Sequence, residues 1–241
     1  MIPQAGGWRV VTYSGLTAGS QMGIDESLAR QGEPTLRLFQ WRRPALSYGF
    51  RRELPPWAEA RLLAPHKIDV VERPTGGGIA VHGSDLSCSV TMRTEPRWSL
   101  RRVMATTCEA LTHTVNAWGL DARWVCDIEQ PLRITYCLTQ ESPYAILIGE
   151  RKVCGLAARR YGTGWLIQGS LLLRPMPAVF RAVMPSDVSE AFAARAISLE
   201  EAAGTSMSEA DVAARIIHAW TQLCHETEDS RVEVGGLVHA V

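Results

Sequence analysis

The order of strand-like and helix-like segments constrains the fold of this chain more than any other feature. Strand-like segments cluster in the first 93 residues and again at 144–173, where three of them follow one another through short glycine-containing turns. This order predicts an α+β domain in which helices flank a mixed, largely antiparallel β-sheet. Helical segments are expected at 20–32, 54–64, 99–119, 178–184 and 208–224.

Composition and charge exclude several classes of protein. The chain has 241 residues, of which 46% are apolar and 21% charged, as in a soluble globular protein, and its formal net charge is zero. Without a clustered basic excess, we expect neither nucleic-acid nor membrane-surface binding. The N-terminus does not resemble a secretion signal, and no run approaches the ~20 apolar residues of a membrane helix. A cytoplasmic protein is therefore expected.

Six cysteines are present, and their spacing matches neither a CxxC pair nor a metal site, so no metal is expected. Cys88, Cys108 and Cys224 fall within strand or helix patterns, which indicates structural thiols. Cys137 lies in the polar stretch "RITYCLTQESPY", where an exposed thiol could act as a nucleophile. The alternative is an incidental loop cysteine.

Lysine is rare in this chain, because only Lys67 and Lys152 among 25 basic residues are lysines. Lys152 interrupts an apolar, strand-like stretch. A surface lysine on a strand is the usual explanation, but the preference for arginine elsewhere weakens it. A compact ammonium fits a narrow site as a point charge and can change its pKa, which a guanidinium cannot.

The stretch "RPTGGGIAVHG" at 73–83 is the third candidate. Its glycines allow a ligand to approach the backbone, and Arg73 could hold a phosphate or a carboxylate. It matches neither a Walker loop nor a dinucleotide-binding turn, and a tight strand-to-strand turn is the plainer interpretation. A pair between His82 and a cysteine stays open. Asp25 and Glu26 are expected on the solvated face of the first helix.

Four segments in order resemble the lipoate-protein ligase and octanoyltransferase family, which shares its fold with biotin protein ligases. They are "WRVVTYSG…SQMGIDESLA", "PTLRLFQWRRPALSYGF", "ERPTGGGIAVHGSDLSCSV" and "GERKVCGLAARRYGTGWLIQGSLLL". The resemblance runs over nearly the whole chain and implies one catalytic domain over 1–241, without the accessory C-terminal domain that many of the ligases carry.

The resemblance also implies site residues. Lys152 falls on the family's active-site lysine, which polarises the acyl carbonyl and stabilises the developing oxyanion. Cys137 precedes it by 15 residues, with Ser-Pro-Tyr between them, as in the cysteine-dependent branch of the family. The apolar strands at 145–173 are expected to supply an acyl tunnel. The implied substrate-binding residues are Arg73, Thr75, Gly76, Gly77, Gly78, His82, Gly155, Gln168 and Gly169.

The cysteine branch implies an octanoyltransferase. Such an enzyme takes an octanoyl or lipoyl group from acyl carrier protein onto the cysteine and passes it to a lysine of a lipoyl-domain protein, such as a glycine cleavage H protein or an E2 subunit. One thioester replaces another, so no cofactor is needed. Lys152, if near Cys137, would favour the thiolate.

Three departures from the family pattern stand out. The residues after the lysine are Cys154-Gly155-Leu156-Ala157 rather than a run through Gly-Ser-Ala, Gln168 replaces a histidine, and Gly83 stands where an aspartate commonly follows the histidine. Cys154 is a second thiol close to Lys152. The sequence leaves its role open.

Other functions compete with this one. An ATP-dependent lipoate ligase would bind an acyl-adenylate at the glycine loop and Lys152, with ATP and magnesium as cofactors and Cys137 as a bystander. An amidotransferase would move the acyl group between two lipoyl-domain proteins through the same cysteine. A non-catalytic homologue would keep the acyl pocket for recognition alone, but a retained Lys152 in a lysine-poor chain argues against it.

Overall fold

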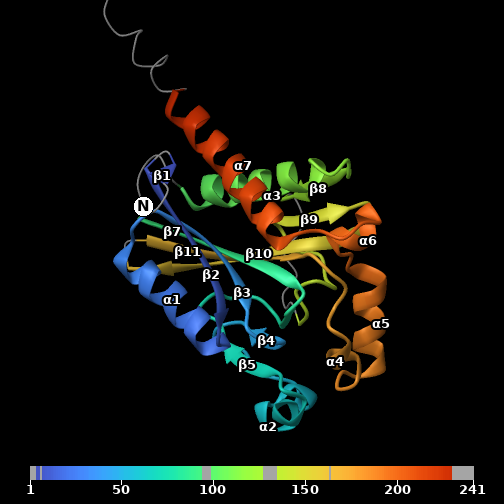
Figure 1. The fold of residues 1–241 in the computed structure, drawn as a ribbon. Coiled ribbons are helices and arrows are strands. Elements are labelled where there is room, and N and C mark those ends of the chain that lie inside the picture. Colours follow the sequence, from blue (N-terminus) through green and yellow to red (C-terminus); the bar gives the residue numbers. More distant parts are fainter. Residues whose placement is uncertain (1–3, 6, 94–98, 127–134, 163, 230–241) are drawn as a thin grey trace, which may run out of the picture.

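The structure is a computed structural model that describes residues 4–5, 7–93, 99–126, 135–162 and 164–229, and it confirms the predicted α+β class (Figure 1). Its centre is an eight-stranded sheet in which every neighbouring pair is antiparallel except β2 and β3. In spatial order its strands are β1 (Gln4–Ala5), β2 (Trp8–Leu16), β3 (Thr35–Trp41), β7 (Asp85–Arg93), β11 (Gly164–Leu172), β10 (Arg151–Tyr161), β9 (Ala145–Ile148) and β8 (Ala122–Val125).

A second, three-stranded sheet holds the glycine stretch. Its central strand β4 (Ala45–Tyr48) is parallel to β5 (Asp69–Glu72) and antiparallel to β6 (Ala80–His82). The loop between β5 and β6 contains Arg73 and the three glycines, as the strand–turn–strand pattern of this region predicts. Both ends of the loop are therefore fixed by strands that pair with β4.

Helices cover both faces of the large sheet (Figure 1). Helix α1 packs on one face, and α3 and α7 pack together on the other. The predicted helix at 99–119 is confirmed as α3, whose N-terminus is capped by Ser99. The helices are α1 (Ala18–Gln31), α2 (Ala60–Leu63), α3 (Leu100–Asn116), α4 (Ala178–Arg181), α5 (Ser186–Arg195), α6 (Leu199–Ala203) and α7 (Glu209–Asp229), with 3₁₀ turns η1 (Pro56–Ala58) and η2 (Ala64–His66).

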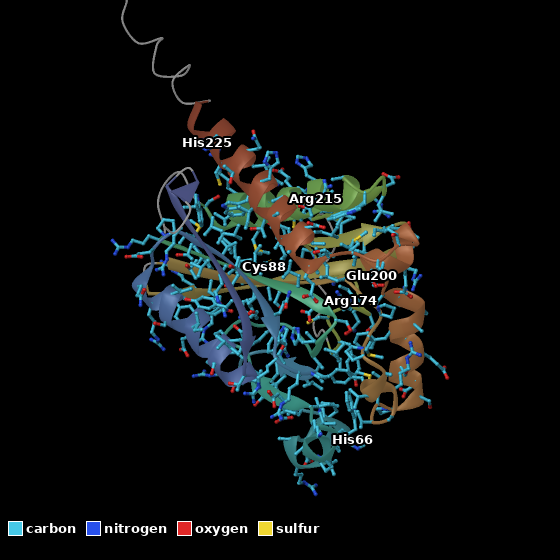
Figure 2. All side chains as sticks on the ribbon, in the orientation of Figure 1. His66, Cys88, Arg174, Glu200, Arg215 and His225 are labelled. Atoms are coloured by element: carbon cyan, nitrogen blue, oxygen red, sulfur yellow. The ribbon has the colours of Figure 1, made fainter. Side chains whose placement is uncertain are left out.

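Arg174, just after β11, joins the last helices to the sheet. Its guanidinium lies 3.4 Å from Glu200 of α6 and 2.6 Å from Glu209 of α7 (Figure 2). Such partly exposed ion pairs stabilise little by themselves. The packing of Ile216 and Trp220 of α7 against the core of the large sheet contributes more, because both side chains are almost completely buried.

The two faces of the large sheet differ in chemistry. Along β7, Leu86, Cys88, Val90 and Met92 face the apolar core beneath α3 and α7. The alternating residues Asp85, Ser87, Ser89 and Thr91 are equally buried but face the other way, because successive side chains of a strand point to opposite sides. The sheet thus has one dry face and one buried polar face, and α1 covers part of the polar face.

Asp25 of α1 belongs to this polar face, so its expected place on a solvated surface was wrong. Its carboxylate is fully buried and accepts hydrogen bonds from Arg37 at 2.5 Å, Ser89 at 2.6 Å and Gln168 at 2.6 Å. Glu26, the next residue, does lie outside and pairs with Arg30 at 2.6 Å. The helix turns about 100° per residue, so adjacent carboxylates face different environments.

Replacing Asp25 by alanine is expected to lower the free energy of unfolding by about 3 kcal/mol or more, because Arg37 would keep a buried charge without its carboxylate. Urea denaturation measures the change, and Glu26→Ala is the matched control, with an expected effect within about 0.5 kcal/mol. Equal effects of the two substitutions would contradict the role assigned to the buried pair.

Candidate active site

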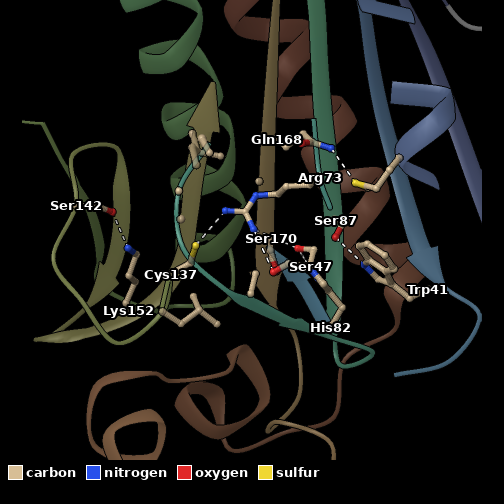
Figure 3. A pocket seen from close by; sticks show the side chains of 18 of the residues that line it. Trp41, Ser47, Arg73, His82, Ser87, Cys137, Ser142, Lys152, Gln168 and Ser170 are labelled. Atoms are coloured by element: carbon tan, nitrogen blue, oxygen red, sulfur yellow. Dashed lines mark hydrogen bonds between the residues drawn. The ribbon is translucent and has the colours of Figure 1, made fainter. Parts of the chain in front are cut away.

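A pocket opens between the two sheets (Figure 3). Polar groups lie among apolar ones along its wall, an arrangement typical of sites that orient a small apolar ligand. The predicted acyl-tunnel strands supply Leu156 and Ala157, but Ile146 and Ile167 point into the core on the other face of the sheet. The remaining apolar lining is Met22, Phe39, Trp41, Ala80 and Leu138.

Cys137 lies at this pocket. Its backbone N–H donates to the carbonyl of Ile79 at 2.8 Å, which ties the segment to the start of β6. The side-chain oxygen of Gln140 accepts from the N–H groups of Thr135 and Tyr136, so the turn is held from within. The half-buried thiol accepts a hydrogen bond from Arg73 Nη2 at 3.4 Å.

Lys152 lines the same pocket from β10, at a bulge in the pairing with β9. It is only 4% exposed, and its Nζ donates to Ser142 Oγ at 2.7 Å and to the Gln140 carbonyl at 3.2 Å. Burial lowers the pKa of Lys152, although the nearby thiols oppose this effect. A side chain at Gly155 would meet Lys152 Nζ at 3.3 Å, so this glycine leaves room for the ammonium.

Cys154 does not share the pocket. It packs on the dry face of the sheet in the cluster that contains Cys88, and burial raises the pKa of its thiol. Cys88, Cys108 and Cys224 are buried as well, as predicted for structural thiols. Among the described residues, Cys137 is the cysteine that lines the pocket.

The glycine stretch leaves room for the guanidinium of Arg73 and the thiol of Cys137. Gly77 has a φ of 92°, and an added Cβ would lie 2.7 Å from Arg73 Nη2 and 3.7 Å from Cys137 Sγ, so both backbone and space require glycine. The Gly76 carbonyl accepts from Arg73, and Gly78 faces a separate cleft beside Tyr48. Of the loop's predicted binding residues, Arg73 and Gly77 therefore line the pocket.

His82 pairs with an aspartate and a serine rather than a cysteine. Its Nδ1 lies 2.8 Å from Asp85 Oδ2, its Nε2 lies 2.8 Å from Ser47 Oγ, and its ring stacks on Trp41 at 4.1 Å. Burial alone would raise the pKa of Asp85, but His82, with hydrogen bonds from Ser170 and Ser87, lowers it. Asp85 thus partners the histidine, although Gly83 occupies the usual aspartate position.

Gln168, which replaces a family histidine, joins the pocket to the buried polar face. Its amide donates to Asp25 at 2.6 Å, and its oxygen accepts from Thr75 Oγ1 at 2.6 Å. Gln168 and Gly169 line the pocket, whereas Thr75 lies behind it.

Sequence reasoning missed Trp41 and Ser47, which carry no signal of their own. Ser142 stands in the Ser-Pro-Tyr that marks the cysteine branch and so could have been found.

A family model described as the lipoyl protein ligase A/B catalytic domain matches residues 18–221. The chain belongs to this family. Octanoyltransferase LipM of Kyrpidia tusciae is 28% identical to it over 95% of this chain and 90% of that protein. The corresponding enzyme of Symbiobacterium thermophilum is 29% identical over 85% of this chain and 81% of that protein.

The fold also matches solved structures. Protein Ta0514 of T. acidophilum with bound lipoic acid superposes with a TM-score of 0.73 and 18% identity, covering 90% of this chain and 84% of that one. At this identity the match shows the fold alone. Within the described residues, no group of three or more His, Cys, Asp or Glu side chains could hold a metal ion, and no helix is long and apolar enough to span a membrane.

Proposed function

We propose that this protein transfers an octanoyl group through a thioester on Cys137 to a lysine of a lipoyl-domain protein, with acyl carrier protein as the donor. The observation that carries the proposal is the meeting of Cys137 and Lys152 in one largely apolar pocket. Relatives named octanoyltransferases, aligned over most of both chains, support it. The apolar lining suits the hydrocarbon chain, and the polar groups suit the reacting end.

In the first half-reaction the Cys137 thiolate attacks the carbonyl carbon of the donor thioester. A C–S bond forms to Cys137, and the bond to the donor sulfur breaks. Lys152 has hydrogen bonds to Ser142 and Gln140, and its ammonium carries a third hydrogen for the carbonyl oxygen of the substrate. It then gives one proton to the departing donor thiolate and becomes a neutral amine.

In the second half-reaction the neutral amine of the acceptor lysine, which has lost a proton to solvent, attacks the acyl-enzyme. The amide bond forms, the C–S bond breaks, and the second amine proton passes to Lys152. Cys137 leaves as a thiolate, and Lys152 regains its charge. The lowered pKa of Lys152 suits this exchange, because both of its protonation states become accessible.

This cycle consumes no nucleotide, which distinguishes it from the ATP-dependent ligase. The test uses purified protein with octanoyl-acyl carrier protein and a lipoyl-domain protein, without ATP, and measures octanoylation of the acceptor by mass. We expect turnover under these conditions and no lipoate-dependent exchange between ATP and pyrophosphate. Exchange without transfer from acyl carrier protein would replace this proposal with the ligase.

A further inference from the structure

Arg73 is a buried cation without a carboxylate. It is 6% exposed, and no acidic side chain among the described residues lies within ion-pair distance of it. Arg37, the other buried arginine of this region, is paired with Asp25. A buried charge without a counter-charge is costly. The surroundings of Arg73 should therefore contain an anion other than a carboxylate.

The contacts of Arg73 identify that anion. Its Nε and Nη2 donate to the Gly76 carbonyl at 3.2 and 2.7 Å, and its Nη1 lies 3.3 Å from both the carbonyl and the hydroxyl of Ser47. These acceptors are neutral. The remaining contact, at 3.4 Å from Nη2, is Cys137 Sγ, which alone in this set becomes an anion by losing a proton.

Lys152 is charge-coupled to Cys137, but its hydrogen bonds go to other groups. Its Nζ bonds with Ser142 and Gln140, and no hydrogen bond joins it to Cys137 among the described residues. Its pKa is lowered by burial, so it readily gives up its proton during the reaction. A guanidinium, by contrast, stays charged throughout, and a permanent counter-charge suits a sulfur that is a thiolate both before attack and on leaving.

We propose that Arg73, rather than Lys152, is the cation that holds Cys137 as a thiolate, and that Lys152 is thereby reserved for moving protons. This proposal rests on the function proposed above. When the thiol ionises, its proton goes to solvent and the sulfur becomes the counter-ion of Arg73. On acylation the sulfur loses that charge, and it regains the charge when the acceptor amine displaces it.

Asp85, His82 and Ser47 are positioning residues for Arg73. Asp85 accepts from the N–H groups of Gly83 and His82 and from the hydroxyls of Ser87 and Ser170, which fixes the histidine with Nδ1 as donor. In a neutral His82, Nε2 then accepts from Ser47, whose oxygen turns its lone pairs toward Arg73 Nη1. The chain of contacts therefore runs from the buried Asp85 carboxylate to the arginine beside the thiol. Figure 3 shows its part from His82 to Cys137.

The test is the rate at which iodoacetamide alkylates Cys137, followed by peptide mapping because other cysteines are present. At about pH 7, Arg73→Gln is expected to slow alkylation about tenfold or more, and raising the pH should restore the rate. Ser47→Ala, which keeps the arginine, is expected to slow it severalfold. Arg159→Gln is the matched control, because Arg159 contacts the same loop through the Pro74 carbonyl and is expected to leave the rate unchanged.

The decisive comparison is with Lys152→Met, which should alkylate within about threefold of the wild-type rate. A tenfold loss in Lys152→Met, with Arg73→Gln and Ser47→Ala unchanged, would overturn the proposal and make the lysine the partner of the thiolate. If Arg73→Gln does not fold, the alkylation rates of Ser47→Ala and Lys152→Met still decide whether the arginine or the lysine is the partner of the thiolate. Alkylation requires no acyl substrate, so this result is independent of whether the octanoyl-transfer function is correct.

Discussion

Cys137→Ala is expected to lower the rate of octanoyl transfer by a factor on the order of 10³ or more, because no other thiol lines the described pocket. The thioester cannot form, and direct attack by the acceptor lysine on the donor would have to replace two assisted steps. The measurement is the rate of octanoylation of a lipoyl-domain protein at saturating donor. The structure of the variant should be unaffected, since Cys137 is half-buried and outside the core clusters.

Cys154→Ala is the matched control for this substitution. Its thiol lies on the dry face of the sheet, although only Val153 separates it in sequence from Lys152. It is expected to keep most of its transfer activity and to lose some stability through the small cavity left behind. Loss of transfer in the Cys154 variant, with activity retained in the Cys137 variant, would exchange the roles of the two cysteines.

Lys152→Met is expected to reduce transfer about 10³-fold and at the same time to stabilise the protein. The rate falls because both half-reactions lose their proton carrier and the stabilisation of the oxyanion. Stability rises because the buried lysine charge, which burial disfavours, is replaced by an apolar chain of similar length. A gain of about 1 kcal/mol corresponds to a rise in Tm of about 2–4 °C.

The lowered pKa of Lys152 fixes the direction of two pH effects. Between its folded value and the higher unfolded value, the unfolded chain binds more protons at this lysine, so its contribution to unfolding free energy increases with pH. Acylation of Cys137 needs the ammonium form and should weaken as pH rises through the folded pKa, below the value for a free lysine. If Lys152→Met is less stable than the wild type and acylates Cys137 with the same pH profile, neither role of Lys152 holds.

Local signals in the sequence predicted the elements that carry the site. The pattern at 99–119 predicted α3. The glycine-rich turn between two strands correctly placed Arg73 in a loop and His82 in the strand that follows it. The 15-residue spacing between Cys137 and Lys152 indicated a loop and a strand, which do bring both side chains to one pocket. In the tail, α5 and α6 were missed, because each is short and only Val188, Phe192 and Leu199 are buried.

Contacts between distant segments could not be predicted. Arg73 and Cys137 are 64 residues apart, and Gln168 and Asp25 are 143 residues apart, so their hydrogen bonds follow only from the assembled sheet. Asp25 and Glu26 show the same limit within one helix. Both are acidic and adjacent, and only the packing of α1 on a polar sheet face buries the first and exposes the second.

Whether Cys137 carries the acyl group can be read from the intact mass of the protein after incubation with octanoyl-acyl carrier protein. We expect one added octanoyl group in the wild type, released by hydroxylamine as expected for a thioester and absent from Cys137→Ala. An adduct that persists in Cys137→Ala, or the absence of any adduct in a wild-type enzyme that transfers octanoyl to the acceptor, would show that Cys137 does not carry the acyl group.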